Sequence, residues 1–452
     1  MRLLTDITPL RQQPAFRRLW LGTMLARTGS AMTTFAVSLQ VYDLTRSTAA
    51  VGGIGAVTLI PLLLITVPGG ALADRVDRRR LVLAVTVGQA VVSAVLFALA
   101  AFGGTVFGNT VLWPLYALVA ATSALSAINA PAWQTFIPRL VPRDQLAAAM
   151  ALNRIIFQVV MIAGPSLAGV VVAWAGLRGC YLADVVSFAG ALWSVGRLPA
   201  MPPEGPTAGE DRAGGDGAGR DRANEAGHGK DRADTGAARG GPKSGLALTI
   251  EGLAFIRRTP VLCGAFLADV NATFFGLPVS LFQAINAERF GGDPRTLGLF
   301  SAAVGVGGLV SAVFAGPLRH ARRHGLVMLA CVAVWGGGFA LFAVTPTLWL
   351  TLLALAVAGL ADTFTVVVRG IIVQEATPER FRGRVNAADF LVGAGGSELG
   401  SLEAGIVGSL TTPVISALSG GLLTIVGAVA IGVAMPSFRG YRSPALARRG
   451  RS

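Results

Sequence analysis

The sequence has little charge and few of the residues that usually perform catalysis. Only 14% of its 452 residues are charged, whereas a soluble domain carries roughly 25%. Its three cysteines, Cys180, Cys263 and Cys331, are far apart and show no metal-binding or redox spacing. Two of its three histidines, His320 and His324, are four residues apart, but arginines surround them and no carboxylate lies nearby. We therefore expect no metal site, and the low charge argues against a soluble enzyme, a disordered protein or a nucleic-acid-binding domain.

A nucleotide-driven mechanism is not expected either. The segment Pro242-Lys243-Ser244 has no glycine before the lysine and follows no predicted strand, so it is not a phosphate-binding loop. Without an ATP site, an ion or substrate gradient must drive any transport. We expect neither an enzyme nor a bound cofactor.

The sequence is rich in long apolar stretches. Hydrophobic residues make up 53% of the chain, glycine adds 58 residues, and the mean hydropathy is +0.62. Twelve apolar runs reach about the 20 residues that a helix needs to cross a bilayer core, near 18–42, 49–73, 81–103, 110–130, 147–175, 180–199, 261–285, 296–316, 325–344, 347–371, 385–409 and 413–435. The runs are uniformly apolar rather than alternating, which favours helices over a barrel. We predict an all-α membrane protein with twelve transmembrane helices, the first of which is too long for the core of a cleaved signal peptide.

The basic residues indicate how the chain lies in the membrane. If both termini are cytoplasmic, 31 of the 38 Lys and Arg fall in cytoplasmic segments and four in outside loops. Such an excess is the positive-inside signal of membrane proteins. The net charge of +14 therefore indicates orientation and contact with the lipid surface, not with nucleic acid. We predict a multi-pass protein of the cytoplasmic (inner) membrane with both termini in the cytoplasm.

One long polar stretch, residues 201–245, divides the chain into two sets of six spans. It contains 12 glycines and few apolar side chains, so it cannot bury enough surface to fold alone. We predict a six-helix N-terminal half at 1–200, a flexible cytoplasmic linker at 201–245, and a six-helix C-terminal half with a short basic tail at 246–452. A binding module within the linker is the alternative. Similar segments begin at Gly70 and Gly316, which indicates two parallel pseudo-repeats.

A short segment before the seventh span has its own pattern. Its apolar residues between 246 and 256, followed by Arg257 and Arg258, fit an amphipathic helix on the inner leaflet. A plain extension of the seventh span fits the pattern equally well.

The loop after the second span carries a family resemblance. Its sequence, Gly70-Ala-Leu-Ala-Asp-Arg-Val-Asp-Arg-Arg-Arg, resembles the Gly-x-Leu-Ala-Asp-Arg-x-Gly-Arg-Arg signature of the major facilitator superfamily. Together with twelve spans and a long central loop, the resemblance covers the chain except 201–245. Within the superfamily the chain is most similar to the enterobactin-exporter group of proton-coupled efflux pumps, on this loop, on Pro14-Ala-Phe-Arg-Arg-Leu-Trp-Leu and on Thr377-Pro-Glu-Arg-Phe-Arg-Gly-Arg-Val-Asn. Related drug–proton antiporters and macrolide exporters share these segments.

The resemblance implies a fold and a role for the loop after the second span. It implies the major facilitator fold, in which the loop after the second span clamps the halves together on the cytoplasmic side. That gating role falls on Gly70, Asp74, Arg75, Arg78 and Arg79. The alternative is a basic topology anchor with Asp74 as a local helix cap. Asp77 departs from the pattern, which usually has glycine there, and the fourth span lacks the buried arginine of many drug–proton antiporters.

A second motif lies in the fifth span. The sequence from Ala163 to Gly169 resembles a Gly-Pro-x-x-Gly-Gly motif associated with exporters. Gly164, Pro165 and Gly169 allow a helix kink and close helix approach, so a packing role alone is the alternative.

Charged residues inside the spans are the best functional candidates, because each is costly in hydrocarbon. Arg27 lies nine residues into the first span, about 13 Å along a helix and near the midplane. We predict a substrate and proton pathway that includes Arg27, Asp269, Asn271, Asp362, Arg369, Glu398 and Glu403. The resemblance implies that the first, fourth, seventh and tenth helices line the central cavity, and four of these residues lie on three of those helices. The alternative is that the two arginines pair with carboxylates only to lock helices together.

Buried carboxylates without a partner suit proton coupling. Burial favours the neutral form of a carboxyl group, so such a group can take and release a proton at physiological pH. Asp269, Asp362 and Glu398 are the candidates for this role, in that order. Asp184 and Asp389 lie near span ends, and we expect them at the membrane interface. Arg154 lies just inside the fifth span, and its long side chain is expected to reach the interface.

These observations predict a secondary carrier. It exports a small molecule, siderophore-like or drug-like, by alternating access against an inward flow of protons, and it is expected to be a monomer in the lipid bilayer. Arg27 would attract an acidic or catecholic group of the substrate. A broad multidrug or macrolide efflux pump, an uptake permease, and a non-transporting receptor or envelope scaffold on the same fold are the alternatives.

Overall fold

The described part of the chain folds almost entirely into helices. The computed structural model describes residues 6–106, 112–198, 245–276, 278–314, 321 and 323–442, without the side chains of 67–71, 73–75, 103–106, 130–135, 245–248 and 312–313. Its helices are α1 (Thr8–Gln12), α2 (Pro14–Thr45), α3 (Thr48–Arg75), α4 (Arg78–Val106), α5 (Leu112–Leu140), η1 (Arg143–Gln145), α6 (Leu146–Gly196), α7 (Gly245–Arg258), α8 (Pro260–Phe275), η2 (Val279–Leu281), α9 (Phe282–Arg289), α10 (Pro294–Phe314), α11 (His324–Val344), α12 (Leu348–Ala376), α13 (Glu379–Leu410), α14 (Pro413–Ala434) and α15 (Pro436–Arg439). The linker predicted at 201–245 lies outside the described residues, apart from the backbone of Gly245.

Long helices occupy the twelve predicted spans. Eight helical segments of the described chain are apolar and long enough to cross a membrane; one of them contains both α8 and α9, and another contains all of α6. The helix α6 holds the fifth and sixth spans, which meet at Gly176, where φ is +68° and ψ is −172°. A side chain is strained at this positive φ, so glycine suits the tight reversal between the two spans.

The seventh span differs from the continuous run predicted at 261–285. The helix α8 ends at Phe275, and η2 and α9 continue the span after a break that contains Gly276 and Pro278. Proline has no backbone N–H to donate, so a helix does not pass through this position without disruption. The break brings Ser280 and Gln283 into the wall of the central cavity.

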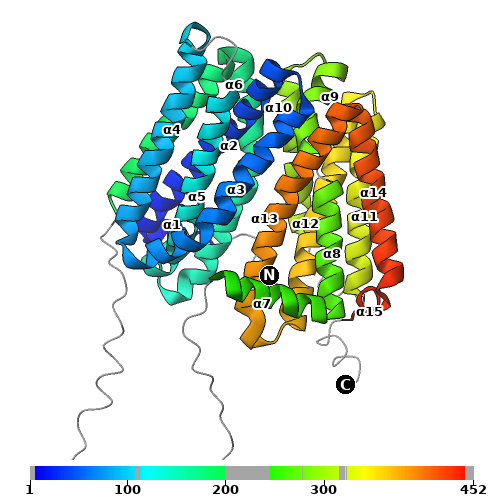
Figure 1. Cartoon of the computed structure of the whole chain (residues 1–452). Coiled ribbons are helices and arrows are strands. Elements are labelled where there is room, and N and C mark those ends of the chain that lie inside the picture. The colour runs from blue at the N-terminus through cyan, green and yellow to red at the C-terminus, as the bar shows by residue number, and fades with distance from the viewer. Residues whose placement is uncertain are drawn as a thin grey trace, which may run out of the picture.

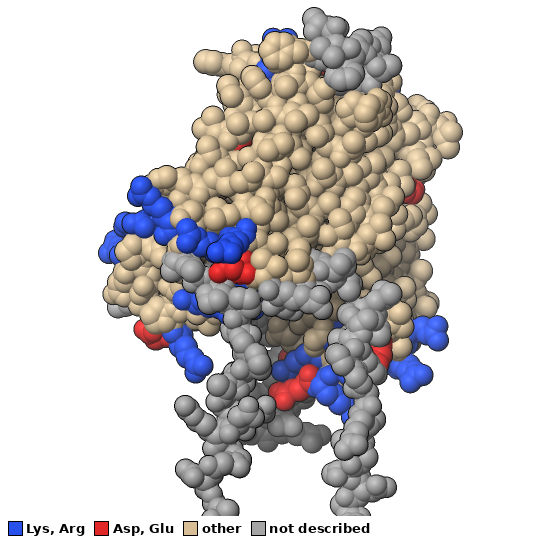
Figure 2. All heavy atoms as spheres, turned by 60° about the vertical axis from the view of Figure 1, so that its left-hand side comes forward, with Lys and Arg blue, Asp and Glu red and all other residues tan. Residues whose placement is uncertain are grey.

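The bundle has two chemically different ends. We call one end the basic face; it carries the start of α2, the α3–α4 turn, α7 and the α12–α13 turn, and it lies at the bottom of Figure 1. The opposite end, called the far end, carries the α2–α3 turn, α9 and the reversal within α6. In Figure 2, Lys and Arg side chains gather toward the basic face, whereas a broad belt above them has few charged side chains.

The helix α7 is separate from the seventh span. Thr259 is extended, with φ −107° and ψ 101°, and divides α7 from α8. Glu251 on α7 forms an ion pair of 2.8 Å with Arg384 on α13, and the ring of Phe255 stacks on that of Phe381 at 4.4 Å. The helix therefore packs against the start of α13 at the basic face (Figure 1).

Two helix pairs join the N-terminal and C-terminal halves near the far end. The helix α3 packs along α13, and α6 packs along α10. In the first pair, the Thr48 hydroxyl donates to the carbonyl oxygen of Gly405 at 2.8 Å. A Cβ atom added at Gly405 would lie 2.4 Å from the carbonyl oxygen of Thr48, so a residue without a side chain is required there. In the second pair, an added Cβ at Gly298 would lie 2.6 Å from the carbonyl oxygen of Pro165.

Replacing Gly405 by alanine should destabilise the protein by about 1–3 kcal/mol, the usual cost of overpacking. The extra methyl group would push α3 away from α13 and weaken the far-end contact. Gly393→Ala is the matched control on the same helix, because no atom lies within 4 Å of its added Cβ. Alanine is the better helix former, so the control should unfold at the same or a higher temperature. Equal thermal unfolding temperatures for the two variants would contradict this account of the contact.

Candidate functional site

A cavity of about 820 Å³ lies between the two halves. Its wall is built from α2, α3 and α6 of the N-terminal half and from η2, α9, α10, α11, α12 and α13 of the C-terminal half. Most of the lining is apolar or aromatic, including Phe35, Phe157, Phe282, Trp335 and Phe339. A volume of this size fits a drug-sized molecule.

The cavity opens toward the basic face. Near the far end, the lining residues Phe282 and Leu297 are 2% and 1% exposed, although Val279 of η2 is 41% exposed. Lining residues nearer the basic face are exposed, with Phe157 at 52% and Met161 at 47%. This gradient, together with the close helix contacts at the far end, describes a cavity closed at one end and accessible from the other.

Two carboxylates lie in the cavity wall without an ion pair. Asp362 on α12 and Glu398 on α13 both line the cavity. Neither has an ion-pair or hydrogen-bond partner among the side chains that the structure describes, although Asp362 lies within electrostatic range of Asp269 and Arg369. Both are among the three carboxylates for which the sequence predicted a role in proton coupling.

A buried ion-pair cluster lies next to Asp362. Arg369 on α12 places Nη1 at 2.5 Å from Oδ2 of Asp269 on α8 and at 3.1 Å from Oδ1 of Asp389 on α13. The cluster joins three helices of the C-terminal half and contains two acids and one base. Because opposite charges are paired at buried positions, the cluster holds these helices together. Asp389 therefore belongs to this interior cluster, and not to the membrane interface where its position in the sequence placed it.

Two arginines belong to the open part of the cavity. Arg154 on α6 lines it, and so is not simply extended to the interface as we expected from the sequence. Arg27 on α2 precedes the lining residues Ala31, Thr34 and Ser38 by four, seven and eleven residues, which places all four on one helix face. Both arginines are exposed, and within the described ranges neither forms an ion pair. They give the cavity a positive side in the N-terminal half.

Of the seven residues predicted for the pathway, Asp362 and Glu398 line the cavity, and the other five are not among its described lining residues. The amide of Asn271 on α8 donates to the carbonyl oxygen of Thr424 at 2.8 Å and so packs α8 against α14. Glu403 lies five residues after Glu398 on α13, on another side of the helix, and is not among the lining residues. The structure thus brings Asp269, Asp362 and Arg369 together. Glu398 lines the same cavity as Asp362, and Arg27 lies on the face of α2 that contributes to its wall.

The exporter-type motif lies at a contact between the halves. Pro165 lines the cavity, and Gly169 is so close to α10 that an added Cβ would lie 2.5 Å from the carbonyl oxygen of Pro294. An added Cβ at Gly164 would lie 2.5 Å from the Cβ of Ala31 on α2. The motif therefore packs α6 against one helix of its own half and one helix of the other.

The structure describes part of the loop after the second span, for which the resemblance implies a gating role. The side chains of Gly70, Asp74 and Arg75 lie outside the described residues. Asp77, at the usual glycine position, accepts a hydrogen bond of 3.0 Å from the backbone N–H of Arg80 and so caps α4. A guanidinium nitrogen of Arg79 donates to the carbonyl oxygen of Gly196 at the end of α6, a contact within the N-terminal half, and Arg78 begins α4.

Sequence reasoning missed a buried carboxylate in the N-terminal half. Asp184 on α6 is 1% exposed and accepts hydrogen bonds of 2.7 Å from the hydroxyls of Thr33 on α2 and Ser93 on α4. Its Oδ1 also accepts from the hydroxyl of Ser187 at 3.3 Å. An added Cβ at Gly29 would lie 2.6 Å from this Oδ1. Asp184 therefore ties three helices together through hydroxyl groups, and does not lie at the interface as we expected.

Replacing Asp184 by alanine should destabilise the protein by about 1–3 kcal/mol, because buried hydroxyl groups lose their acceptor. Asparagine keeps the size and one acceptor oxygen, so Asp184→Asn should cost less. Thermal unfolding of the purified variants measures both. If the Asp184→Ala variant unfolds at the same temperature as the wild type, these hydrogen bonds do not stabilise the N-terminal half.

The fold and the site define a class of protein. A bundle of long apolar helices in two halves, with a cavity and charged side chains between them, is a multi-pass membrane transporter. A family model described as a transmembrane secretion effector matches residues 4–213, and the model of the Major Facilitator Superfamily matches residues 261–449. The chain belongs to the major facilitator superfamily.

Relatives and solved structures agree with this family. The chain is 25% identical over 445 residues to the enterobactin exporter EntS of Citrobacter koseri, covering 98% of this chain and 96% of the relative. It is similar to a POT family transporter crystallised with 5-aminolevulinic acid, with a TM-score of 0.68 and 12% identity over 94% of this chain and 97% of that one. A bacterial homologue of the iron transporter ferroportin, in an inward-facing state, gives a TM-score of 0.64 and 16% identity over 95% and 99% of the two chains. The prediction of twelve transmembrane helices in two six-helix pseudo-repeats is confirmed.

Proposed function

We propose that this protein exports a small molecule from the cytoplasm across the inner membrane by alternating access, in exchange for protons. One observation carries the proposal: the cavity is closed at the far end, is accessible from the basic face, and holds the unpaired carboxylates Asp362 and Glu398 in its wall. The basic face is then the cytoplasmic one, in keeping with the excess of Lys and Arg in the segments that meet there. Loading from the cytoplasm is the first step of export.

The two sides of the cavity have separate tasks in this mechanism. Arg27 and Arg154 attract an acidic or catecholic group of the substrate, because both are free cations at the open part of the cavity. The aromatic wall buries the apolar part of the molecule. Asp362 and Glu398 bind protons when the cavity opens outward and release them when it opens to the cytoplasm. Release of the protons restores negative charge in the wall, which repels acidic substrate groups toward the arginines across the cavity.

The ion-pair cluster connects proton binding to helix position. Arg369 is shared between Asp269 and Asp389 and lies within electrostatic range of Asp362. Protonation of Asp362 removes one acid that competes for the arginine. A changed balance among three acids and one base moves α12 relative to α8 and α13, and this motion is the proposed link between protonation and closure of the cavity.

The loop and the helix motif are proposed to act in the same cycle. The loop residues Gly70, Asp74, Arg75, Arg78 and Arg79 clamp the cytoplasmic ends of the halves when the cavity opens outward. Pro165 and Gly169 form the α6 side of the far-end contact and separate from α10 in that state, while Gly164 keeps α6 packed on α2. The halves at 1–200 and 246–452 move as the two domains, and 201–245 is a linker between them. The exporter is proposed to work as a monomer.

The relatives suggest a substrate to test. Because the matched relative is named an enterobactin exporter, we propose a siderophore-like substrate. Cells with and without the gene are grown under iron limitation, and the extracellular siderophore is measured. We expect extracellular siderophore to fall, and intracellular siderophore to rise, when the gene is removed. Unchanged siderophore export together with unchanged drug sensitivity would rule out both versions of the exporter.

A broad efflux pump is the second candidate function. The aromatic and apolar cavity wall favours it, since such walls bind many unrelated apolar molecules. Resistance to several unrelated compounds on overexpression would support this function over siderophore export. If the triple variant Asp269→Asn, Asp362→Asn and Glu398→Gln keeps the full cellular function of the wild type, that result would instead support a non-transporting receptor or scaffold on this fold.

A further inference from the structure

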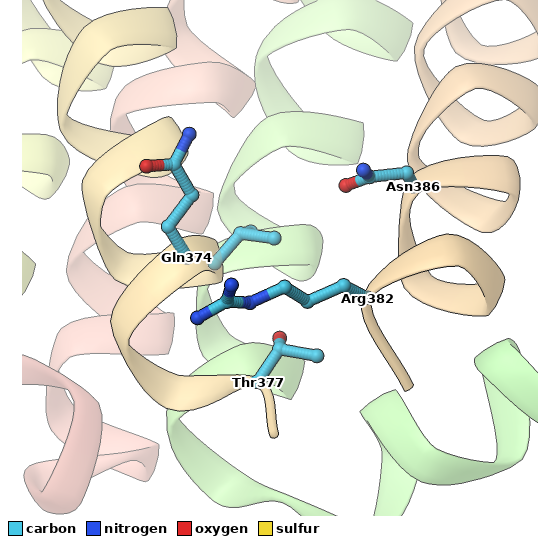
Figure 3. A pocket seen from close by; sticks show the side chains of 5 residues that line it. Gln374, Thr377, Arg382 and Asn386 are labelled. Atoms are coloured by element: carbon cyan, nitrogen blue, oxygen red, sulfur yellow. The ribbon is translucent and has the colours of Figure 1, made fainter. Parts of the chain in front are cut away.

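A second, smaller pocket lies at the basic face between α12 and α13. It has a volume of about 280 Å³ and is lined by Val373, Gln374 and Thr377 of α12 and its end, and by Arg382 and Asn386 of α13. In Figure 3, the side chains of Arg382 and Asn386 extend from α13 toward α12, where Gln374 and Thr377 lie. None of the five lining residues is acidic, and one is a cation.

One buried polar group of this pocket lacks a partner. Thr377 is only 3% exposed, yet its hydroxyl oxygen has no hydrogen-bond partner among the described residues. A buried hydroxyl without a partner is costly, so a ligand that accepts its proton would remove that cost. The amides of Gln374 and Asn386 add further N–H donors beside it.

The cation is available for a ligand. Arg382 contacts Glu379 at 3.6 Å, but Glu379 is 89% exposed, and such surface pairs are weak. The neighbouring acid Glu375 accepts a hydrogen bond of 3.4 Å from the Tyr441 hydroxyl and is not a lining residue. Arginine presents paired N–H groups that match a carboxylate or phosphate.

The pocket continues the cavity-facing sides of both helices. On α12, the cavity-lining Val366 is followed at seven and eleven residues by Val373 and Thr377. On α13, the cavity-lining Ser397 follows Asn386 by eleven residues. Residues at these spacings share a helix face, so the pocket lies on the approach to the central cavity from the basic face.

We propose that this pocket binds an oxyanionic group, a carboxylate or a phosphate, of a molecule that reaches the protein at the basic face. Arg382 supplies the charge, and the Thr377 hydroxyl and the two amides complete the set of donors. A soluble molecule and the phosphate of an anionic lipid both offer this chemistry. Use of the pocket as the first docking point of an exported molecule rests on the proposed export function, whereas the binding itself does not.

Binding is tested with the full-length protein in a neutral detergent. The probe is 4-fluorobenzoate, followed by its ¹⁹F NMR line width, with inorganic phosphate as competitor. We expect saturable broadening that phosphate reverses, and about tenfold weaker binding in Arg382→Gln, since one charge-assisted hydrogen-bonding group is lost. Thr377→Val should also weaken binding. Arg380→Gln is the matched control, because Arg380 lies over the ring of Phe381 and does not line the pocket.

The remaining arms separate the sources of the signal. Broadening that persists in the double variant Arg27→Gln, Arg154→Gln assigns it to the pocket and not to the central cavity. Absence of saturable broadening in the wild type, or equal binding in wild type and Arg382→Gln, would overturn the proposal. In phospholipid nanodiscs, loss of the signal when anionic phosphatidylglycerol replaces zwitterionic phosphatidylcholine would identify the headgroup of an anionic lipid as the occupant, and an unchanged signal would favour a soluble molecule. A failed export assay with intact binding would count against the proposed function alone.

Discussion

Replacing Asp362 by asparagine is expected to lower proton-driven accumulation of the substrate about tenfold at a gradient of one pH unit. Each proton exchanged across such a gradient supplies about 1.4 kcal/mol, which supports a roughly tenfold concentration ratio. Asp362 lines the cavity without an ion pair, and asparagine keeps its shape but cannot exchange a proton. Substrate binding and substrate–substrate exchange should therefore persist. The measurement is steady-state accumulation in everted membrane vesicles at several imposed pH gradients.

A matched control excludes a general effect of removing a negative charge. Asp43 lies at the far end of α2, pairs with Arg46 at 3.6 Å, and has a side chain that is 48% exposed. Asp43→Asn should accumulate substrate like the wild type. If Asp362→Asn keeps the full dependence on the pH gradient, Asp362 does not couple protons, and Glu398→Gln becomes the variant to measure.

Replacing Arg369 by alanine should have the largest effect on stability, about 3–5 kcal/mol. The substitution removes the positive partner of the buried acid Asp269 and of Asp389, whose side chain is 34% exposed. Thermal unfolding of the purified protein measures the loss, which should appear also as a low yield of folded protein. Asp43→Ala removes one member of an exposed pair and should cost less than about 1 kcal/mol.

Compensating substitutions keep this prediction testable even if the single variant does not fold. The triple variant Arg369→Gln, Asp269→Asn, Asp389→Asn removes all three charges and should recover much of the lost stability. Its proton-coupled transport should stay impaired, because the proposed link between protonation and helix motion is gone. A stable Arg369→Ala protein with normal transport would contradict the role of this cluster.

The twelve-helix architecture could be predicted because its physical cause is local. A bilayer requires runs of about 20 apolar residues, and such runs are visible one at a time along the chain. The break in the seventh span was not predicted, although Gly276 and Pro278 mark it, because the flanking residues are apolar and hide it in a hydropathy profile. The separate helix α7 could only be stated as one of two alternatives, since its position depends on contacts with Phe381 and Arg384 on α13.

The sequence was sufficient to find most of the charged residues of the site, but it was not sufficient to find which of them form pairs. Asp269, Asp362, Arg369 and Glu398 could be found because charge inside a span is rare. Their partners depend on which helix faces meet, and one sequence does not contain that information. For this reason Asp184 and Asp389 were placed at the interface on their distance from a span end. The Thr33 and Ser93 hydroxyls that donate to Asp184 come from two other helices, and no spacing in the sequence reveals them.

In the proposed mechanism, substrate and protons cross the membrane in opposite directions through one cavity. The most direct measurement uses the protein in proteoliposomes with a trapped pH indicator, and adds the siderophore probe from one side. The account predicts proton movement opposite to the substrate in the wild type, and none in the double variant Asp362→Asn, Glu398→Gln. Substrate transport without proton movement in the wild type, or unchanged proton movement in the double variant, would contradict it.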